Sequence, residues 1–245
     1  VAALKKCIAL LSGGEAIRGQ EPANDAIFES PDALGWAYQY WNTEEKGRVF
    51  EMVRTKKGAK IEGADIIPVT QLYTEPYMVK FLVQNSLGAI WMGMYPESKL
   101  CDKWEYYVKD ADRAPVEKKP VSEITFLDPA CGSGHFHLEA FDIFYAMYEE
   151  ECILKSLEEI CASILNNNLF GIDIDGRAVQ IASAALWMKA REKAKNLNAS
   201  DVVSLRDHLV ATNIRLSKGK DHLEIFLKKH PEDEPLRKAL KMVFQ

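Results

Sequence analysis

A short β-prone segment that runs through a glycine-rich turn into a long helical stretch constrains the fold of this chain most. Residues Ile124–Leu127 are apolar or β-branched, and they lead into the sequence DPACGSG at residues 128–134. A helical pattern follows from His135 to about Glu150. This order predicts a strand, a turn and a helix. The turn would lie at the carboxyl end of a parallel strand, where open α/β sheets bind ligands.

Two further apolar segments predict neighbouring strands. The second strand is expected at Leu169–Ile174, and the third lies within Asp207–Asn213, in the sequence HLVATN. Helical patterns over Cys152–Leu165 and Ala178–Lys195 separate the strands. The alternation of strands and helices favours an α/β domain with about three parallel strands.

The residues before the first strand predict helices. Apolar residues recur at helical spacing over Ala2–Leu11, Asp32–Asn42, Glu44–Lys56 and Tyr77–Leu87. Gly88 would end the last of these helices. A loop is expected at Gly58–Pro68, an irregular segment at residues 93–120, and a charged helical tail at residues 221–245. Core packing is expected, rather than stacking on bases, for the aromatic residues Trp36, Tyr38, Tyr40 and Trp41.

The glycine-rich turn has the properties of a ligand-binding loop. Gly132 and Gly134 have no Cβ, so a ligand could approach the backbone closely, and the helix that follows offers unbonded N–H groups. The turn does not match the dinucleotide pattern GxGxxG, because His137 stands in place of the third glycine, nor the phosphate-binding pattern GK[ST]. By itself, such a turn could equally be structural.

An acidic segment, GIDID at residues 171–175, ends the second predicted strand. A carboxylate there can accept hydrogen bonds from both ribose hydroxyls of a nucleoside, and Asp173 is the better candidate. Asp175 is expected to cap the next helix. Taken alone, an acidic strand end is more often a cap or a solvated residue. Together with a glycine turn about 40 residues earlier, it favours a nucleoside-containing ligand.

Composition and charge limit the classes of function. The net charge of −5 argues against this chain alone as the main DNA-binding surface, because isolated nucleic-acid-binding domains are usually basic. No run of about 18 apolar residues occurs, so no membrane partner is expected. The five cysteines form no CxxC pair, which is typical of a reducing cytosol and predicts a cytoplasmic protein.

A metal site is not expected, although Cys131, His135 and His137 lie close together in the sequence. No second cluster with the spacing of zinc ligands follows them. Cys131 is interpreted as a small residue of the turn, since the sequence offers no base that would activate it as a nucleophile.

The motifs resemble those of one enzyme family. DPACGSGHF resembles the cofactor motif of N6-adenine DNA methyltransferases, and NLFGIDIDGRAVQIASAALWMKA resembles the acidic motif and helix that follow it. TQLYTEPYMVKFLVQNSLG resembles the segment that precedes the cofactor motif when the cap over the cofactor is N-terminal. Together with ALGWAYQYW, the pattern is similar to the large methylases of phage-defence systems, namely the phage growth limitation (BREX) type and restriction–methylation fusions. The resemblance covers about residues 32–215.

The resemblance implies a fold, a cofactor and a domain organisation. The fold would be a partial Rossmann-like S-adenosylmethionine-dependent methyltransferase fold preceded by an N-terminal helical segment. The domains would be an N-terminal helical segment at residues 1–68, a cofactor-cap segment and linker at 69–120, and part of the cofactor-binding domain at 121–245. The cofactor would be S-adenosyl-L-methionine.

The resemblance also implies roles for individual residues. Three residues of the cap would lie over the methionine end of the cofactor: Tyr73, Thr74 and Pro76. The amino group of the cofactor would be held by Asp128, directly or through water. The floor of the site would be formed by Ala130, Cys131, Gly132 and Gly134, and Pro129 would also belong to the cofactor site. Asp173 would bind the ribose and Ile174 would pack on the adenine. The family usually has an acidic residue at the end of the third strand, whereas this sequence offers Asn213.

One element of the family is missing from the sequence. Adenine methylases of this kind carry an (Asn/Asp/Ser)-Pro-Pro-(Tyr/Phe) motif that holds a flipped-out adenine, and this chain has no Pro-Pro dipeptide. We therefore assign no catalytic residue and expect the chain alone to be inactive. DNA would bind through regions mostly outside this chain, and the uncovered edge of the first strand could support a dimer. Methylation of RNA or protein, and a non-catalytic cofactor-sensing or structural module, remain alternative functions.

Overall fold

The computed structural model contains a three-stranded parallel sheet within the described residues 33–111, 114–154 and 156–212. The strands are β1 (Phe126–Asp128), β2 (Leu169–Asp173) and β3 (Leu209–Ala211), in the order β1-β2-β3. Phe126 pairs with Leu169, and Gly171 pairs with Leu209. The predicted α/β fold with three parallel strands is therefore confirmed.

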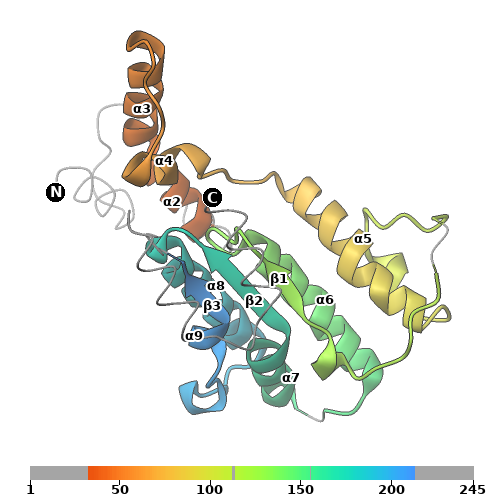
Figure 1. Ribbon diagram of the computed structural model, residues 1–245. Coiled ribbons are helices and arrows are strands. Elements are labelled where there is room, and N and C mark those ends of the chain that lie inside the picture. Colours follow the sequence, from red (N-terminus) through yellow and green to blue (C-terminus); the bar gives the residue numbers. More distant parts are fainter. Residues whose placement is uncertain (1–32, 112–113, 155, 213–245) are drawn as a thin grey trace, which may run out of the picture. The chain divides into compact units, whose positions relative to one another are not determined.

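Two long helices cover one face of this sheet. Helix α6 (His135–Glu151) follows β1 and helix α8 (Gly176–Lys193) follows β2. They contact each other and both lie behind the sheet in the view of Figure 1. This arrangement brings the carboxyl ends of β1 and β2 and the first turns of both helices to the same end of the sheet.

The pleat divides the side chains of the sheet into a buried and an uncovered set. Leu169 and Leu209 face the helices and are buried. On the opposite face Leu127 is 58% exposed and Val210 is 38% exposed. The described residues therefore cover one face of the sheet only, and they place β1 at its edge.

Helix α5 (Pro76–Met94) packs along α6 and is longer than the sequence predicts. Gly88 was expected to end this helix, and this prediction is wrong. A Cβ built on Gly88 would lie 2.8 Å from the ring of Trp104. The glycine therefore allows an indole to pack against the middle of the helix, and no turn is needed there.

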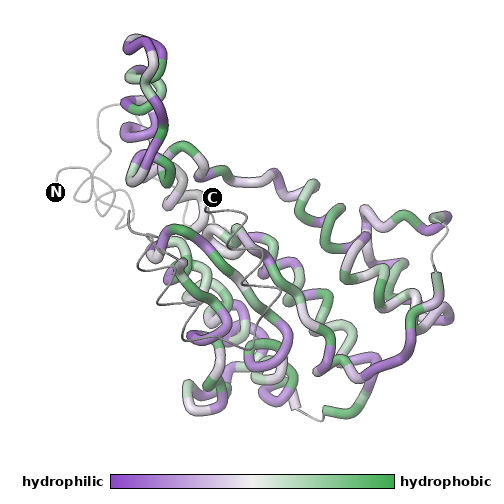
Figure 2. Tube along the Cα trace, viewed as in Figure 1, coloured by the Kyte–Doolittle hydropathy of each residue, from purple (hydrophilic) through white to green (hydrophobic). Residues whose placement is uncertain are grey.

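The segment before α5 is helical as predicted in its first part. Helices α2 (Ala33–Trp41) and α3 (Thr43–Thr55) are confirmed. The expected loop at Gly58–Pro68 is only partly present, because a 3-10 turn at Gly63–Asp65 leads into α4 (Ile66–Thr70). Figure 2 shows α3 as a largely hydrophilic helix, which agrees with its exposure.

Four aromatic residues of this segment were expected to pack in the core; the prediction is correct for one and wrong for two, and the side chain of Trp36 lies outside the described ones. Tyr38 is buried, whereas Tyr40 is 72% exposed and Trp41 is 59% exposed. Tyr38 differs because α2 packs against α8, and its hydroxyl donates to the carboxylate of Asp175, the residue before α8.

The remaining elements are short. The expected helix at Cys152–Leu165 is shorter than predicted, because α7 spans Leu157–Ser163 and begins at a capping box formed by Ser156 and Glu159. A π-helical turn at Ile164–Asn168 connects it to β2. The other short helices are Leu100–Lys103, Val121–Glu123, Ala199–Asp201 and α9 (Leu205–His208). The helices predicted at Ala2–Leu11 and at residues 221–245 lie outside the described residues.

None of the described helices combines the length and the apolar character needed to cross a membrane. The proposed division into segments 1–68, 69–120 and 121–245 stays a prediction.

Candidate functional site

The turn between β1 and α6 depends on two glycines with positive φ. Gly132 has φ +52° and Gly134, the residue before α6, has φ +86°. A Cβ on Gly134 would lie 2.9 Å from the Cβ of Ala182, so the glycine lets α8 approach the start of α6. A Cβ on Gly132 would meet nothing within 4 Å. Glycine is therefore needed for a different reason at each position. At Gly134 it allows close packing of two helices, and at Gly132 it leaves the space beside the turn open.

The turn is tied directly to the acidic end of β2. The backbone N–H of Gly132 donates to one carboxylate oxygen of Asp173 at 2.8 Å, and the N–H of Asp175 donates to the other oxygen at 2.8 Å. The N–H of Cys131 also donates to the carbonyl of Ile172 at 2.9 Å. Each carboxylate oxygen has more than one lone pair, so Asp173 can still accept hydrogen bonds from a ligand.

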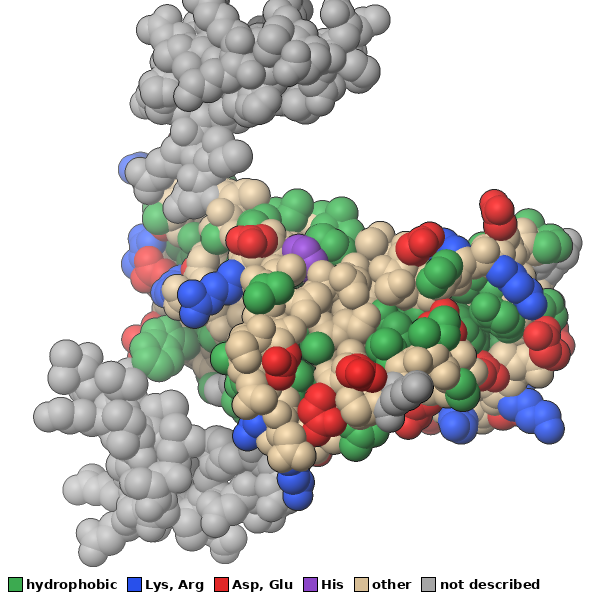
Figure 3. Space-filling model, turned by 90° about the horizontal axis from the view of Figure 1, so that it is seen from below, with side chains coloured by type: hydrophobic (Ala, Val, Ile, Leu, Met, Phe, Trp, Pro, Cys, Tyr) green, Lys and Arg blue, Asp and Glu red, His purple; other side chains and the backbone are tan. Residues whose placement is uncertain are grey.

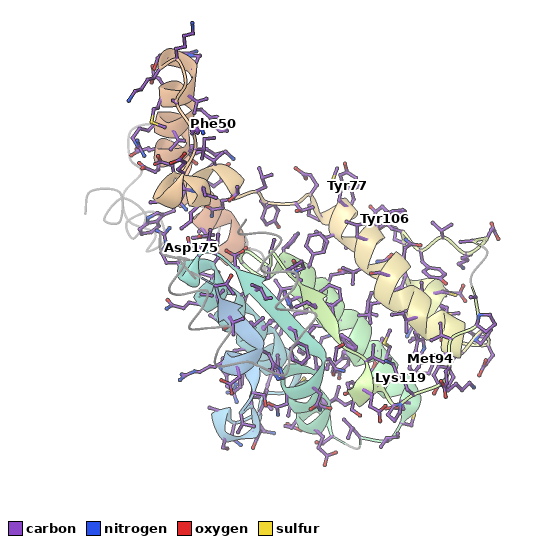
Figure 4. The ribbon with its side chains drawn as sticks, viewed as in Figure 1. Phe50, Tyr77, Met94, Tyr106, Lys119 and Asp175 are labelled. Carbon is purple, nitrogen blue, oxygen red and sulfur yellow. The ribbon has the colours of Figure 1, made fainter. Side chains whose placement is uncertain are left out.

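Asp175 caps α8, as predicted. Its side chain accepts from the backbone N–H of Arg177 at 3.0 Å and pairs with the Arg177 guanidinium at 2.8 Å. The hydroxyl of Tyr38 donates to the same carboxylate. Burial alone would raise the pKa of Asp175, but the bonds from Arg177 and Tyr38 reverse this effect and lower the pKa. Asp175 is therefore a buried, charged junction between α2 and α8, and Figure 4 places it at the end of β2 beside α2.

A cavity of about 280 Å³ lies over the turn and the end of β2. This volume is near the lower end of the range for small-molecule sites, roughly 300–1,000 Å³. Six of the residues implied by the resemblance line it: Tyr73, Pro129, Ala130, Gly132, Asp173 and Ile174. The fold therefore brings Tyr73 of the expected cofactor-cap segment, the glycine-rich turn and the acidic end of β2 to one cavity.

Other residues implied by the resemblance lie beside this cavity. Asp128 accepts the N–H of Ala130 at 3.0 Å and borders a separate hollow between α5 and the edge of β1. Cys131 is buried beneath the turn. Pro76 borders another hollow, next to His135. Thr74 and Gly134 also do not line the cavity, and Asn213 lies outside the described residues.

The cavity has a second wall that sequence reasoning missed. Helix α2 contributes Gly35 and Tyr38, and the region of α4 contributes Ile67, Thr70 and Gln71. The floor also includes Ser133, Asp175, Ala178 and Thr212. The signal for this wall in the sequence was the group of aromatic residues around Tyr38, which we interpreted as ordinary core residues.

Cys131 has no nucleophilic character in this environment. Burial, together with the charges of Asp173 and Asp128, raises the pKa of its thiol to about 12. Among the described residues no group of three or more histidine, cysteine or acidic side chains is placed to hold a metal ion.

His137, which replaces the third glycine of the dinucleotide pattern, supports the turn from below. Its Nε2 lies 2.8 Å from the carbonyl oxygen of Phe170, and the ring packs edge-on against Phe126. A carbonyl only accepts, so Nε2 carries the proton. A Cβ on Gly171 would come within 2.9 Å of this ring. The buried imidazole thus fills the space between α6 and the sheet.

The burial of His137 predicts a pH-dependent stability. Burial lowers the pKa of His137, against smaller opposing effects of the Phe170 carbonyl and the Asp128 charge. Below about pH 6.5 the unfolded chain binds a proton that the folded chain does not. The free energy of unfolding should therefore decrease as pH falls from about 6.5 to the lowered pKa, by at most about 1.4 kcal/mol per pH unit.

Urea unfolding between pH 7.5 and 5.5 measures this slope, and His137→Asn should flatten it. Burial also lowers the pKa of His208, which contributes equally to both proteins. Equal slopes in the wild-type chain and the variant would contradict a buried neutral His137.

Together, the fold and the cavity define a class of fold: a Rossmann-like α/β domain with a cavity at the carboxyl ends of its parallel strands, which is where open α/β sheets bind ligands. The comparisons with known proteins narrow this class. Residues 111–213 match the family described as "MmeI, DNA-methyltransferase domain". The resemblance to N6-adenine DNA methyltransferases of phage-defence systems, and the partial methyltransferase fold that it implied, are confirmed.

Curated relatives extend the similarity beyond this family match. The chain is 38% identical over 180 residues to the adenine-specific methyltransferase BrxX of Escherichia coli O9:H4 (strain HS), an alignment that covers 69% of this chain. It is 39% identical over 177 residues to the adenine-specific methyltransferase PglX of Lacticaseibacillus casei (strain Zhang), covering 66% of this chain. The aligned part spans only 14% of the length of each relative.

Proposed function

We propose that this chain is the S-adenosylmethionine-binding part of a DNA adenine-N6 methyltransferase of a restriction-modification or phage-defence system. The observation that carries the proposal is the hydrogen bond between the Gly132 N–H and the Asp173 carboxylate, which joins the glycine turn and the acidic strand end on one cavity. Both elements belong to the residues that match the methyltransferase family.

The residues present fit this cofactor. The open space beside Gly132 would take the chain of atoms that links the ribose to the sulfonium, since no side chain fills it. Asp173 would accept from the ribose hydroxyls, and the half-exposed Ile174 would pack on the adenine. Tyr73, whose ring packs at a tilt against His135 with centroids 4.5 Å apart, would close the site from the cofactor-cap segment. When bound, the cofactor supplies an electrophilic methyl group.

Methyl transfer to DNA belongs to the longer protein in this proposal. The names of the relatives state adenine-specific methylation, and the chain aligns with a small part of each. Figure 3 shows acidic and basic side chains scattered over one face of the described part, without a continuous basic surface on it. Three further expectations remain predictions. They are DNA contact through other regions, self-association through the edge of β1, and a cytoplasmic location.

Asp173→Ala should weaken binding of S-adenosylmethionine by about 10- to 100-fold. A hydrogen bond to a charged group contributes about 1.5–3 kcal/mol, which corresponds to this range of affinity. Isothermal titration calorimetry measures the effect. Asp207→Ala is the control, because Asp207 is exposed and does not line the cavity. An unchanged affinity in Asp173→Ala would remove Asp173 from the cofactor site.

A further inference from the structure

Helix α2 is held against the acidic end of β2 by a short chain of contacts. The Tyr38 hydroxyl donates to the Asp175 carboxylate, and the Asp175 N–H donates to Asp173 at 2.8 Å. Asp173 in turn accepts the N–H of Gly132 at 2.8 Å. One residue therefore separates Tyr38 from the carboxylate proposed to bind the ribose, and Tyr38 itself lines the same cavity.

Side-chain bonds from the neighbouring segment hold the position of Tyr38. The side-chain amide of Gln71 donates to the backbone carbonyl of Tyr38 at 3.1 Å, and its oxygen accepts from Asn42 at 2.5 Å. Lys46 donates to the carbonyl of Gln71 at 3.3 Å. Gln71, the residue after α4, thus connects α2, which walls the cavity, to the start of α3.

The same wall lies directly against the glycine turn. A Cβ on Gly35 would lie 2.9 Å from the hydroxyl oxygen of Ser133 and 3.5 Å from the ring of Tyr73. Helix α2 therefore contacts the turn at Gly35 and the strand end at Tyr38, one helical turn apart. Ordinary core packing does not require a tyrosine hydroxyl on a buried carboxylate, since phenylalanine would fill the same volume.

We propose that Tyr38 is a positioning residue for the cofactor, which acts through Asp175 on Asp173 and walls the nucleoside end of the cavity. This inference rests on the proposed function. With the Tyr38 hydroxyl in place, the Asp175 carboxylate is held both from α2 and by Arg177. These contacts fix Asp175, and so they fix its backbone N–H, which donates to Asp173. Without the hydroxyl, Asp173 and the wall would be less well ordered before the cofactor binds, and affinity would fall.

The test compares Tyr38→Phe with Tyr40→Phe in calorimetric titrations with S-adenosylmethionine. Both variants lose one hydroxyl from α2, but Tyr40 is 72% exposed and does not line the cavity. Tyr38→Phe should lower the affinity by about five- to tenfold, the size expected from one net hydrogen bond. Tyr40→Phe should bind as the wild-type chain does.

A double-mutant cycle with Asp175→Ala, which leaves the Tyr38 hydroxyl without its acceptor at this position, separates positioning from general loosening. If Tyr38 acts through Asp175, the double variant binds no more weakly than Asp175→Ala alone. A second ligand, S-adenosylhomocysteine without its ribose 2′-hydroxyl, should lose less affinity on Tyr38→Phe than the intact ligand does. A purely structural tyrosine would weaken both ligands equally and act additively with Asp175→Ala.

The outcomes distinguish this inference from the proposed function. Wild-type affinity in Tyr38→Phe, with binding lost in Asp173→Ala, would overturn the role of Tyr38 and leave the proposed function standing. Additive effects, or equal losses for the two ligands, would also overturn it. Absence of binding by the wild-type chain would overturn both.

Discussion

Gly132→Val is expected to abolish binding of S-adenosylmethionine while the chain stays folded. Gly132 lines the cavity, and its missing Cβ points into space that no protein atom occupies within 4 Å. A valine side chain would fill the volume that the cofactor needs and would lower the affinity by more than about 100-fold, as complete steric exclusion requires.

The matched control for this variant is Gly58→Val. Gly58 also has positive φ, +80°, and nothing within 4 Å of its missing Cβ, but it lies outside the cavity. Both variants place a β-branched residue in the left-handed region, at a cost of about 1–2 kcal/mol. Calorimetry and circular dichroism of the two variants separate backbone strain from loss of the ligand space. A folded Gly132→Val chain that binds normally would contradict the placement of the cofactor over this turn.

Gly134→Ala is expected to be the most destabilising single-methyl substitution in the turn, by about 2–4 kcal/mol. The new Cβ would stand 2.9 Å from the Cβ and 3.1 Å from the Cα of Ala182. Backbone of α8 would have to move, and overpacking of this kind costs about 1–3 kcal/mol in addition to the strain of φ +86°.

Chemical denaturation of Gly134→Ala beside Gly58→Ala isolates the packing contribution. Gly58→Ala carries the strain of a positive φ without a close neighbour, so it should lose only about 1 kcal/mol. Equal losses in the two variants would show that α6 and α8 are not closely packed at Ala182.

The sheet and its two main helices could be predicted because their signals are local. Ile124–Leu127 and Leu169–Ile174 are short apolar runs, and each is followed by a turn and a helical pattern. Asp175 caps the second of these helices. The cavity at the carboxyl ends of these strands follows from parallel topology alone. The contact of Gly132 with Asp173 agrees with this geometry.

The second wall of the cavity could not be predicted, because it depends on contacts between distant residues. Tyr38 and Asp175 are 137 positions apart, and nothing near Tyr38 in the sequence distinguishes it from the exposed Tyr40. Gly88 was misinterpreted for a similar reason, since its partner Trp104 belongs to a segment without a periodic pattern. Sequence periodicity identifies which face of a helix is buried, but it does not identify what that face contacts.

Calorimetric titration of the wild-type chain with S-adenosylmethionine tests the central claim most directly. We expect saturable binding of one molecule per chain, with binding lost in Gly132→Val and retained in Gly58→Val. The absence of binding heat from the wild-type chain at millimolar cofactor, or equal binding by Gly132→Val and Gly58→Val, would contradict the assignment of this cavity to the cofactor.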